Sequence, residues 1–286
     1  MTNREQPFLG SEALATRVLR QHQLRTRFRA VFPDVYVLRG PDLTVQQRAM
    51  AAWLWSHRQS VLAGLTAAAW QGSKWVDERL PIELICSNTR PPPGIRTSAR
   101  HLEADEVGVV AGVPVTTPTR TAFDIGRRGT IGTAVAQLDA LMRATGAKAP
   151  DIAELADRYR GARGLRQLET VLELTDPGAA SPKETWLRLL LIRAGLPRPT
   201  TQIPVVGPDS GKTYYLDMGW EEVMVAVEYD GEQHRLDPWQ YKNDVRRREE
   251  IDKLSWIVIR VLAGDRAADI LPRVTDARAA RLGRPR

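Results

Sequence analysis

The chain has 286 residues, enough for two domains of ordinary size, and 43% of them are hydrophobic, which allows a buried core in each. Charged residues make up 26% of the chain, and no apolar run approaches the roughly 20 residues that a membrane span needs. The first residues are polar and charged, unlike a secretory signal. Cys86 is the single cysteine and the four histidines are dispersed, so neither an internal disulfide nor a structural zinc site is expected. We therefore expect a folded, soluble, cytoplasmic protein without a membrane partner.

The formal net charge is +7, and the excess of basic residues lies mainly in the first part of the chain. A thirteen-residue stretch without any acidic residue contains Arg17, Arg20, Arg25, Arg27 and Arg29. Such a local positive field attracts phosphate groups, so these arginines are candidates for DNA contacts. The alternative is an ordinary solvated basic face.

The N-terminal region reads as a helix followed by a hairpin. Residues 11–24 predict a short helix with Ser11 as its N-cap. Residues 25–32 and 34–40 alternate apolar and polar side chains around Pro33-Asp34, which predicts two strands joined by a turn. A helix followed by a basic hairpin resembles a shortened winged-helix DNA-binding domain. Small units of this kind also occur in proteins that bind no nucleic acid.

The middle of the chain predicts a mixed region followed by helices. Thr117-Pro118 resembles an N-cap followed by proline at the first helical position, which opens a helix through Arg127. Four tryptophans could stack on bases, but such residues more often belong to a core or an interface; they are Trp53, Trp55, Trp70 and Trp75. The other predicted elements are helices at 44–58, 65–71, 131–145, 151–160 and 165–175, strands at 81–87 and 113–117, and a proline-rich loop at 89–101.

After a turn at residues 176–181, the pattern predicts the order α-β-β-β-α-β. The first helix is capped by Ser181 and Pro182 and ends at Gly195. The remaining predicted elements are strands at 201–206, 213–220 and 223–231, a helix at 241–254 and a strand at 256–262. Residues 207–213 resemble a phosphate-binding loop, but they have one residue too few between the glycines and precede a strand, so we interpret them as a hairpin turn.

Carboxylates gather on two of these strands. Asp217 and Glu228 are eleven residues apart with a tight turn between their strands, and Asp230 shares a strand face with Glu228. Converging carboxylates raise one another's pKa unless a cation is present, and oxygen ligands suit Mg²⁺ or Mn²⁺. Glu184 could join them as a metal ligand, or it could complete a capping box with Ser181.

Residues 180–262 resemble the PD-(D/E)XK nuclease superfamily, specifically the branch of the very-short-patch-repair endonucleases. The resemblance is carried by PKETWLRLLL, YLDMGW, VAVEYDGEQHR, DVRRREEIDKLSW and WIVIRV. It implies that Glu184, Asp217 and Glu228 hold Mg²⁺ for hydrolysis of DNA. It also implies that Gln233 and His234 lie near the scissile phosphate, with His234 transferring a proton or holding water; a plain surface-loop histidine is the alternative.

One departure from that family concerns its lysine. The motif places a lysine two residues after the strand acid, where this chain has Asp230. A cation from the next helix would have to replace it, and the candidates are Lys242, Arg246, Arg247 and Arg248. Loss of cleavage with retention of DNA binding therefore stays open.

The first half resembles the AbiEi-type antitoxin proteins, in which a winged-helix unit precedes a mixed α/β domain. The resemblance covers about residues 8–128 and is carried by FRAVFPDVYVLRG, VLAGLTAAAWQG and VPVTTPTRTAFDIGRR. It implies binding to promoter DNA and a possible toxin or other protein partner encoded nearby.

These observations predict an α/β (α+β) chain in four parts. The parts are a winged-helix-like basic region (1–60), a mixed α/β region (61–130), a helical connector (131–179) and an endonuclease-like domain (180–286).

Two functions remain in competition. The first is a Mg²⁺-dependent DNA endonuclease with an N-terminal targeting region. Its catalytic residues would be Glu184, Asp217, Glu228, Asp230, Gln233 and His234, and its DNA contacts Arg17, Arg20, Arg25, Arg27, Arg29, Lys242 and Arg247. The second is a non-enzymatic DNA-binding regulator or antitoxin with a degenerate nuclease domain. RNA as a target and a homo-oligomeric state stay open in both.

Overall fold

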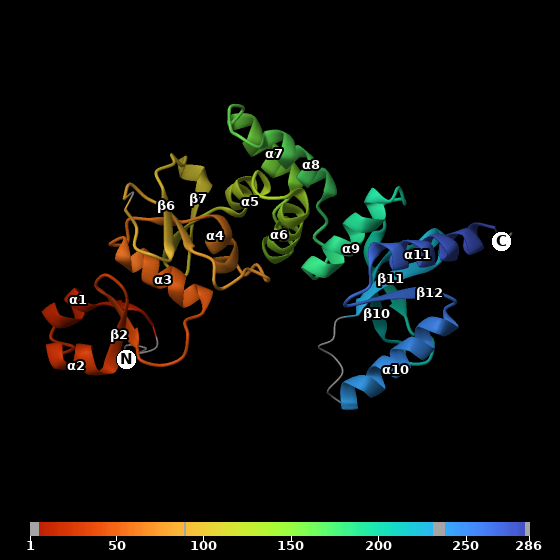
Figure 1. The fold of residues 1–286 in the computed structure, drawn as a ribbon, viewed down its shortest axis with the longest axis horizontal. Helices are drawn as coiled ribbons and strands as arrows, with labels where there is room; N and C mark the ends of the chain where they lie inside the picture. The colour runs from red at the N-terminus through yellow and green to blue at the C-terminus, as the bar shows by residue number, and fades with distance from the viewer. Residues whose placement is uncertain (1–5, 89, 231–237, 284–286) are drawn as a thin grey trace. The chain divides into compact units, whose positions relative to one another are not determined.

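The computed structural model describes residues 6–88, 90–230 and 238–283, with the main chain alone for 238–244. The chain divides into two compact units, Met1–Glu173 and Leu174–Arg286 (Figure 1). Helices are combined with three antiparallel or mixed sheets, which confirms the predicted α+β class. Among the described residues, no helix has the length and apolar character needed to cross a membrane.

Unit 1 begins with a three-stranded sheet in the order β1-β3-β2 and two short helices. The predicted single helix over 11–24 is wrong: the chain forms two helices, because residues 16–20 make a turn in which Arg17 has a φ of 56°. The predicted hairpin is confirmed, and its second strand starts directly after Asp34. The elements are β1 (Phe8–Leu9), α1 (Gly10–Ala15), α2 (Gln21–Arg27), β2 (Phe28–Phe32) and β3 (Val35–Leu38).

A five-stranded sheet in the order β6-β5-β4-β8-β7 follows. The predicted loop at 89–101 is wrong in its second half, where Ile95–Ser98 forms β6, parallel to β5. The prolines before Ile95 favour a loop, so the sequence does not indicate this strand. The elements are α3 (Val45–Trp55), β4 (Val61–Leu62), α4 (Gly64–Trp70), β5 (Ile82–Ile85), β6 (Ile95–Ser98), the 3₁₀ helix η1 (Ala104–Glu106), β7 (Val107–Val110) and β8 (Val113–Thr116).

The rest of unit 1 is helical. Thr117 caps α5 by accepting a hydrogen bond from the N–H of Arg120, as its pairing with Pro118 predicted. Buried Leu138, Ile152 and Leu168 give α6, α7 and α8 their inward faces. These helices belong to unit 1 in the division of the chain, and their bounds are α5 (Pro118–Gly126), α6 (Ile131–Thr145), α7 (Ala149–Arg158) and α8 (Leu165–Leu174).

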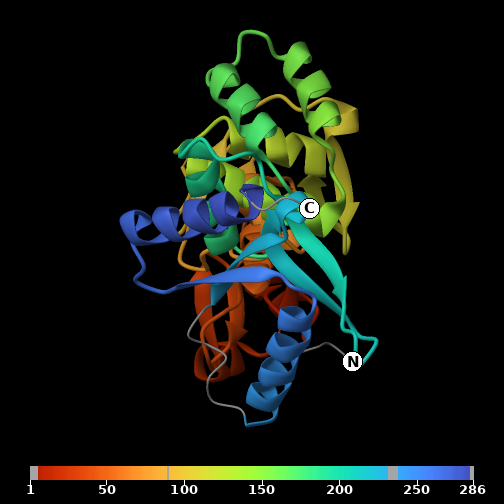
Figure 2. The same ribbon diagram turned by 90° about the vertical axis from the view of Figure 1, so that its right-hand side faces the viewer.

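Unit 2 has the predicted order α-β-β-β-α-β, followed by one further helix. Its sheet runs β12-β11-β10-β9, with β11 and β12 parallel and the other pairs antiparallel. Helices α9 and α11 pack on one side of the sheet and α10 on the other, as Figure 2 shows. The elements are α9 (Pro182–Arg193), β9 (Thr200–Val206), β10 (Thr213–Trp220), the 3₁₀ helix η2 (Glu221–Val223), β11 (Val225–Asp230), α10 (Pro238–Lys253), β12 (Ile257–Leu262) and α11 (Ala267–Leu282).

Candidate nucleic-acid interface and carboxylate cluster

The pair α1 and α2 is fixed to the hairpin that follows it. The N–H of Gly10 donates to the carbonyl of Asp34 at 2.8 Å, and the N–H of Ser11 donates to the Asp34 carboxylate at 2.9 Å. A Cβ at residue 10 would lie 2.5 Å from the ring of Tyr36, so this close approach requires glycine. Buried Leu24 and Phe28 hold α2 against the same small core. The two helices and the hairpin therefore form one rigid element.

The outer face of α2 is polar and open to solvent. Gln21, His22, Arg25 and Thr26 are exposed on it, opposite buried Leu24. Because the sequence predicted one continuous helix over residues 11–24, it did not indicate that a separate helix begins at Gln21. Gln21 and His22 were therefore not among the predicted site residues.

The predicted arginines surround this face. Arg17 and Arg20 lie in the turn before α2, and Arg25 and Arg27 in its last turn; all four are exposed, and Arg29 on β2 is half-buried. In the described part of the chain, no carboxylate forms an ion pair with any of the five. Since residues 1–60 contain nine arginines and four acidic residues, this region carries an excess of positive charge.

The order of elements here is strand, helix, helix, hairpin, with the first strand pairing with the hairpin. This order resembles that of a winged helix-turn-helix, a motif whose second helix enters the major groove of DNA. In this chain the second helix is α2.

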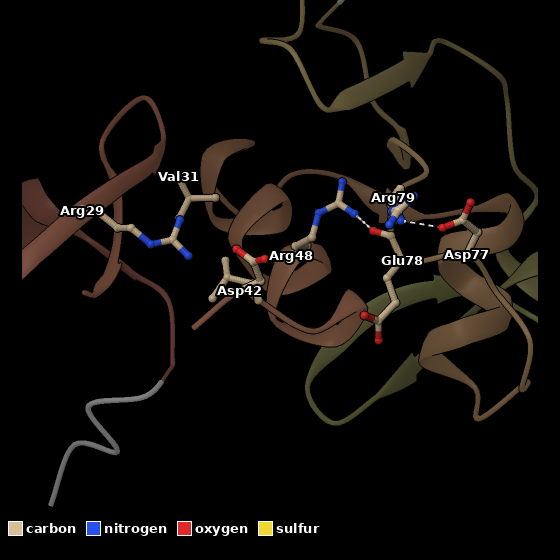
Figure 3. Close-up of a pocket in the computed structure, with 8 residues that line it drawn as sticks. Arg29, Val31, Asp42, Arg48, Asp77, Glu78 and Arg79 are labelled. Atoms are coloured by element: carbon tan, nitrogen blue, oxygen red, sulfur yellow. Dashed lines mark hydrogen bonds between the residues drawn. The ribbon is translucent and has the colours of Figure 1, made fainter. Parts of the chain in front are cut away.

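A groove of about 710 Å³ lies beside β2 and α3 (Figure 3). Arg48 on α3 donates to the backbone carbonyls of Glu78 and Leu80 and so fixes the segment 77–80. The remaining lining side chains include arginines and acids in similar number, namely Arg29, Arg79, Asp42, Asp77 and Glu78. This mixed charge makes the groove a poorer phosphate site than the surface around α2.

The segment VPVTTPTRTAFDIGRR builds a buried ion-pair network. Arg120 is 3% exposed, pairs with Glu106 and, through Nε, with the Asp124 carboxylate at 3.0 Å. Tyr159 donates to Glu106 at 2.7 Å. Because these residues come from η1, α5 and the end of α7, the network joins the helical part of unit 1 to its sheet.

In unit 2 the strand register brings Asp217 beside Glu228. Met218 pairs with Val227, and one step further along the antiparallel strands Asp217 faces Glu228. The Asp217 carboxylate accepts a hydrogen bond from the N–H of Tyr229 at 2.9 Å. Burial, and then the nearby negative charge of Glu184, raise the pKa of Asp217 to about 7. The three predicted acids thus lie near one another, with Asp217 in the middle of β10.

Two of these acids already have partners from the protein. Glu184 accepts from the N–H of Ala180 and from Ser181 Oγ. Its own N–H donates to Ser181 Oγ at 3.2 Å, which is one of the two contacts of the predicted capping box. Glu228 is paired with Arg247 of α10, and the Arg260 guanidinium lies 3.9 Å away. Among the described residues, no three Asp, Glu, His or Cys side chains are arranged to hold a metal ion.

The other predicted site residues are spread more widely. Asp230 is half-buried at the last position of β11. Gln233, His234 and the side chain of Lys242 lie outside the described residues. Of the tryptophans, Trp53, Trp55 and Trp70 pack against the core of unit 1, as the core interpretation predicts, whereas Trp75 is 59% exposed.

Comparison with known proteins identifies similarity in the first half of the chain. Residues 56–174 match the AbiEi antitoxin C-terminal domain. This confirms the predicted likeness to antitoxins for residues 56–128. The matched range also includes the Arg120 network.

The chain is also 26% identical, over 235 residues, to an uncharacterized protein in each of two strains of Mycobacterium tuberculosis. The similarity spans 82% of this chain and 85% of each relative. The nuclease likeness of residues 180–262 stays a prediction.

Proposed function

We propose that this protein is a DNA-binding regulator of the antitoxin type, and that α2 is its DNA-recognition helix. The observation that carries this proposal is the exposed polar face of α2, surrounded by arginines with no ion-pair partner in the described chain. The match of the following residues, 56–174, to an antitoxin domain supports it.

The side chains divide into two roles. Gln21 and Arg25 are one turn apart on the exposed face, and Gln and Arg are the side chains that bind adenine and guanine edges with two hydrogen bonds. Arg17, Arg20 and Arg27 flank that face and would bind phosphates, which fixes the position of the helix on the duplex. A toxin encoded nearby is the protein partner that the antitoxin likeness implies.

The test is DNA binding as a function of salt, on duplexes selected by the wild-type protein from a random library. The triple variant Arg17→Ala/Arg20→Ala/Arg27→Ala should weaken binding and reduce the slope of log K against log salt by about 0.9 for each lost phosphate contact. The matched control is Arg160→Ala/Arg163→Ala/Arg166→Ala, which removes the same charge from three exposed arginines of unit 1. Equal slopes for the two triple variants would show that the surface around α2 does not bind DNA.

A second candidate function is Mg²⁺- or Mn²⁺-dependent cleavage of DNA by unit 2. One observation favours it, the placement of Asp217 beside Glu228 and Glu184. The ion pair between Arg247 and Glu228 weighs against it.

Supercoiled and single-stranded DNA incubated with Mg²⁺, Mn²⁺ or EDTA separates the two candidates. Metal-dependent cleavage by the wild type that disappears in Glu228→Ala would support the nuclease. If the wild type and Glu228→Ala bind DNA equally and neither cleaves it, the DNA-binding regulator is the supported function.

A further inference from the structure

Strand β7 forms one edge of the five-stranded sheet, and that edge is apolar. Its sequence is Val-Gly-Val-Val, and in the described chain β8 is its single strand neighbour. Val109 is 69% exposed and Val110 38%. An exposed apolar edge is a template for another strand, and proteins usually protect such edges with charge, proline or short length.

The other sheet edges of the described chain have such protection. Strand β1 has two residues and follows Pro7. Strands β2, β6 and β12 contain Arg29, Arg96 and Arg260, and β9 contains Pro204. Because β7 contains neither a charged residue nor proline, and has four residues where β1 has two, it is the edge best suited to pairing with a further strand.

The hairpin geometry shows which backbone groups of β7 point outward. Val110 and Val113 flank the two-residue turn Ala111-Gly112, so they form a hydrogen-bonded pair. Alternation then makes Val109 and Pro114 a non-hydrogen-bonded pair, consistent with the missing N–H of proline. The N–H and C=O groups of Val109 and, two residues earlier, of Val107 are therefore directed away from the sheet.

We propose that two copies of this chain pair through β7, antiparallel, about a twofold axis at Gly108. Around that axis Val107 of one copy faces Val109 of the other, and the outward groups of both form about four hydrogen bonds. The glycines face each other where strands approach most closely, and a Cβ built at Gly108 meets no atom within 4 Å of its own chain. The two five-stranded sheets become one continuous sheet.

A second copy fits this edge better than a foreign strand. The segment Val107-Gly108-Val109 reads the same in both directions, so it is complementary to itself under a twofold axis. It offers no charge by which another protein could be selected. A twofold contact also closes after two copies, which prevents continued edge-to-edge growth.

The test is a disulfide placed on the proposed axis of the full-length protein. In a Cys86→Ser background, Gly108→Cys would put two cysteines in a non-hydrogen-bonded pair with Cα atoms about 4.5 Å apart, a separation that a disulfide spans. The matched control is Val110→Cys, on the same strand, whose two copies would lie roughly 14 Å apart. We expect covalent dimer from Gly108→Cys under mild oxidation and at least tenfold less from Val110→Cys. Equal yields from both, or no dimer from Gly108→Cys, would overturn the proposal.

A second measurement needs no cysteine and no DNA. A four-residue strand pair buries less than the roughly 1,200 Å² of a stable interface, so the free dimer should be weak. In sedimentation equilibrium, the mean mass of the wild type should rise with concentration, and Val109→Lys should stay monomeric. Val206→Lys, which alters another exposed edge valine, should behave as the wild type. A monomeric wild type at every concentration, or association unaffected by Val109→Lys, would contradict the proposed interface.

Discussion

Arg247 and Glu228 join helix α10 to strand β11 through two hydrogen bonds from one guanidinium. The Arg247 Nη1 to Glu228 Oε2 distance is 3.2 Å, and Arg247 also donates to the carbonyl of Tyr215 at 2.9 Å. The Glu228 side chain is 9% exposed and that of Arg247 is 25% exposed. The counter-charge of Glu228 therefore comes from the protein itself.

Replacing Arg247 should destabilise unit 2. Arg247→Met leaves a buried carboxylate whose nearest remaining cation among the described side chains is Arg260, at 3.9 Å. We therefore expect the free energy of unfolding to fall by about 2–4 kcal/mol. Urea unfolding followed by tryptophan fluorescence measures this. Arg248→Met, at an exposed neighbouring position, should change stability by about 0.5 kcal/mol or less. A similarly small effect of Arg247→Met would show that the ion pair does not stabilise the fold.

Asp217 should make unit 2 less stable as pH rises. Its pKa is about 7 in the folded protein, above the ordinary value of 3.8, so the folded form keeps the proton that the unfolded chain releases. Its stabilising contribution is complete below about pH 4 and is lost as pH rises through 7. Between pH 5 and 7 the wild type should lose about 2–3 kcal/mol more than Asp217→Asn does.

Urea unfolding at several pH values tests this dependence. Asp276→Asn, at an exposed aspartate of α11, is the control and should keep the wild-type profile. Identical profiles for the wild type and Asp217→Asn would place the titrating group elsewhere.

Arg120 should be essential for the stability of unit 1. Arg120→Met would leave Glu106 and Asp124, each 2% exposed, without their main cation, which costs about 3–5 kcal/mol. Thermal unfolding should show a large fall in Tm for this variant. The control is Arg166→Met, at an exposed position of α8. Equal Tm values for Arg120→Met and Arg166→Met would show that the ion-pair network does not stabilise unit 1.

Gln21 should affect the sequence specificity of DNA binding rather than the contacts to the phosphate backbone. Gln21→Ala removes a two-hydrogen-bond contact to a base, so discrimination at one base pair should fall by about 1–3 kcal/mol. The slope of log K against log salt should stay that of the wild type. Binding to a set of single-base variants of the selected duplex measures both quantities. Equally weakened binding to every duplex, with discrimination unchanged, would assign Gln21 to the phosphate backbone.

Local sequence signals predicted much of this fold, and the misses have physical reasons. Alternation and caps located the helix that begins after Thr117 and the strands bearing Asp217 and Glu228. Nothing in the sequence signals the positive φ of Arg17 that divides the first helix in two. The short strand β7 lacks the turn residues that would mark its start, and α11 was not predicted.

The carboxylate cluster was also predictable only in part. The proximity of Asp217 and Glu228 was predictable because their strands follow each other with a tight turn between them and pair antiparallel. The pairing of Arg247 with Glu228 depends on how α10 packs across the sheet, a long-range relation that sequence periodicity does not contain.

Helix α3 packs against the strands of the N-terminal sheet and also against α4, β4 and β5 (Figure 1). Its buried Ala49, Ala51, Ala52 and Leu54 belong to a single core with residues of both sheets. The matched antitoxin domain starts at Ser56, directly after this helix. A gene fusion or truncation at that point would therefore split an apolar core. The N-terminal element that contains α2 and the five-stranded sheet therefore share one core and move as one body.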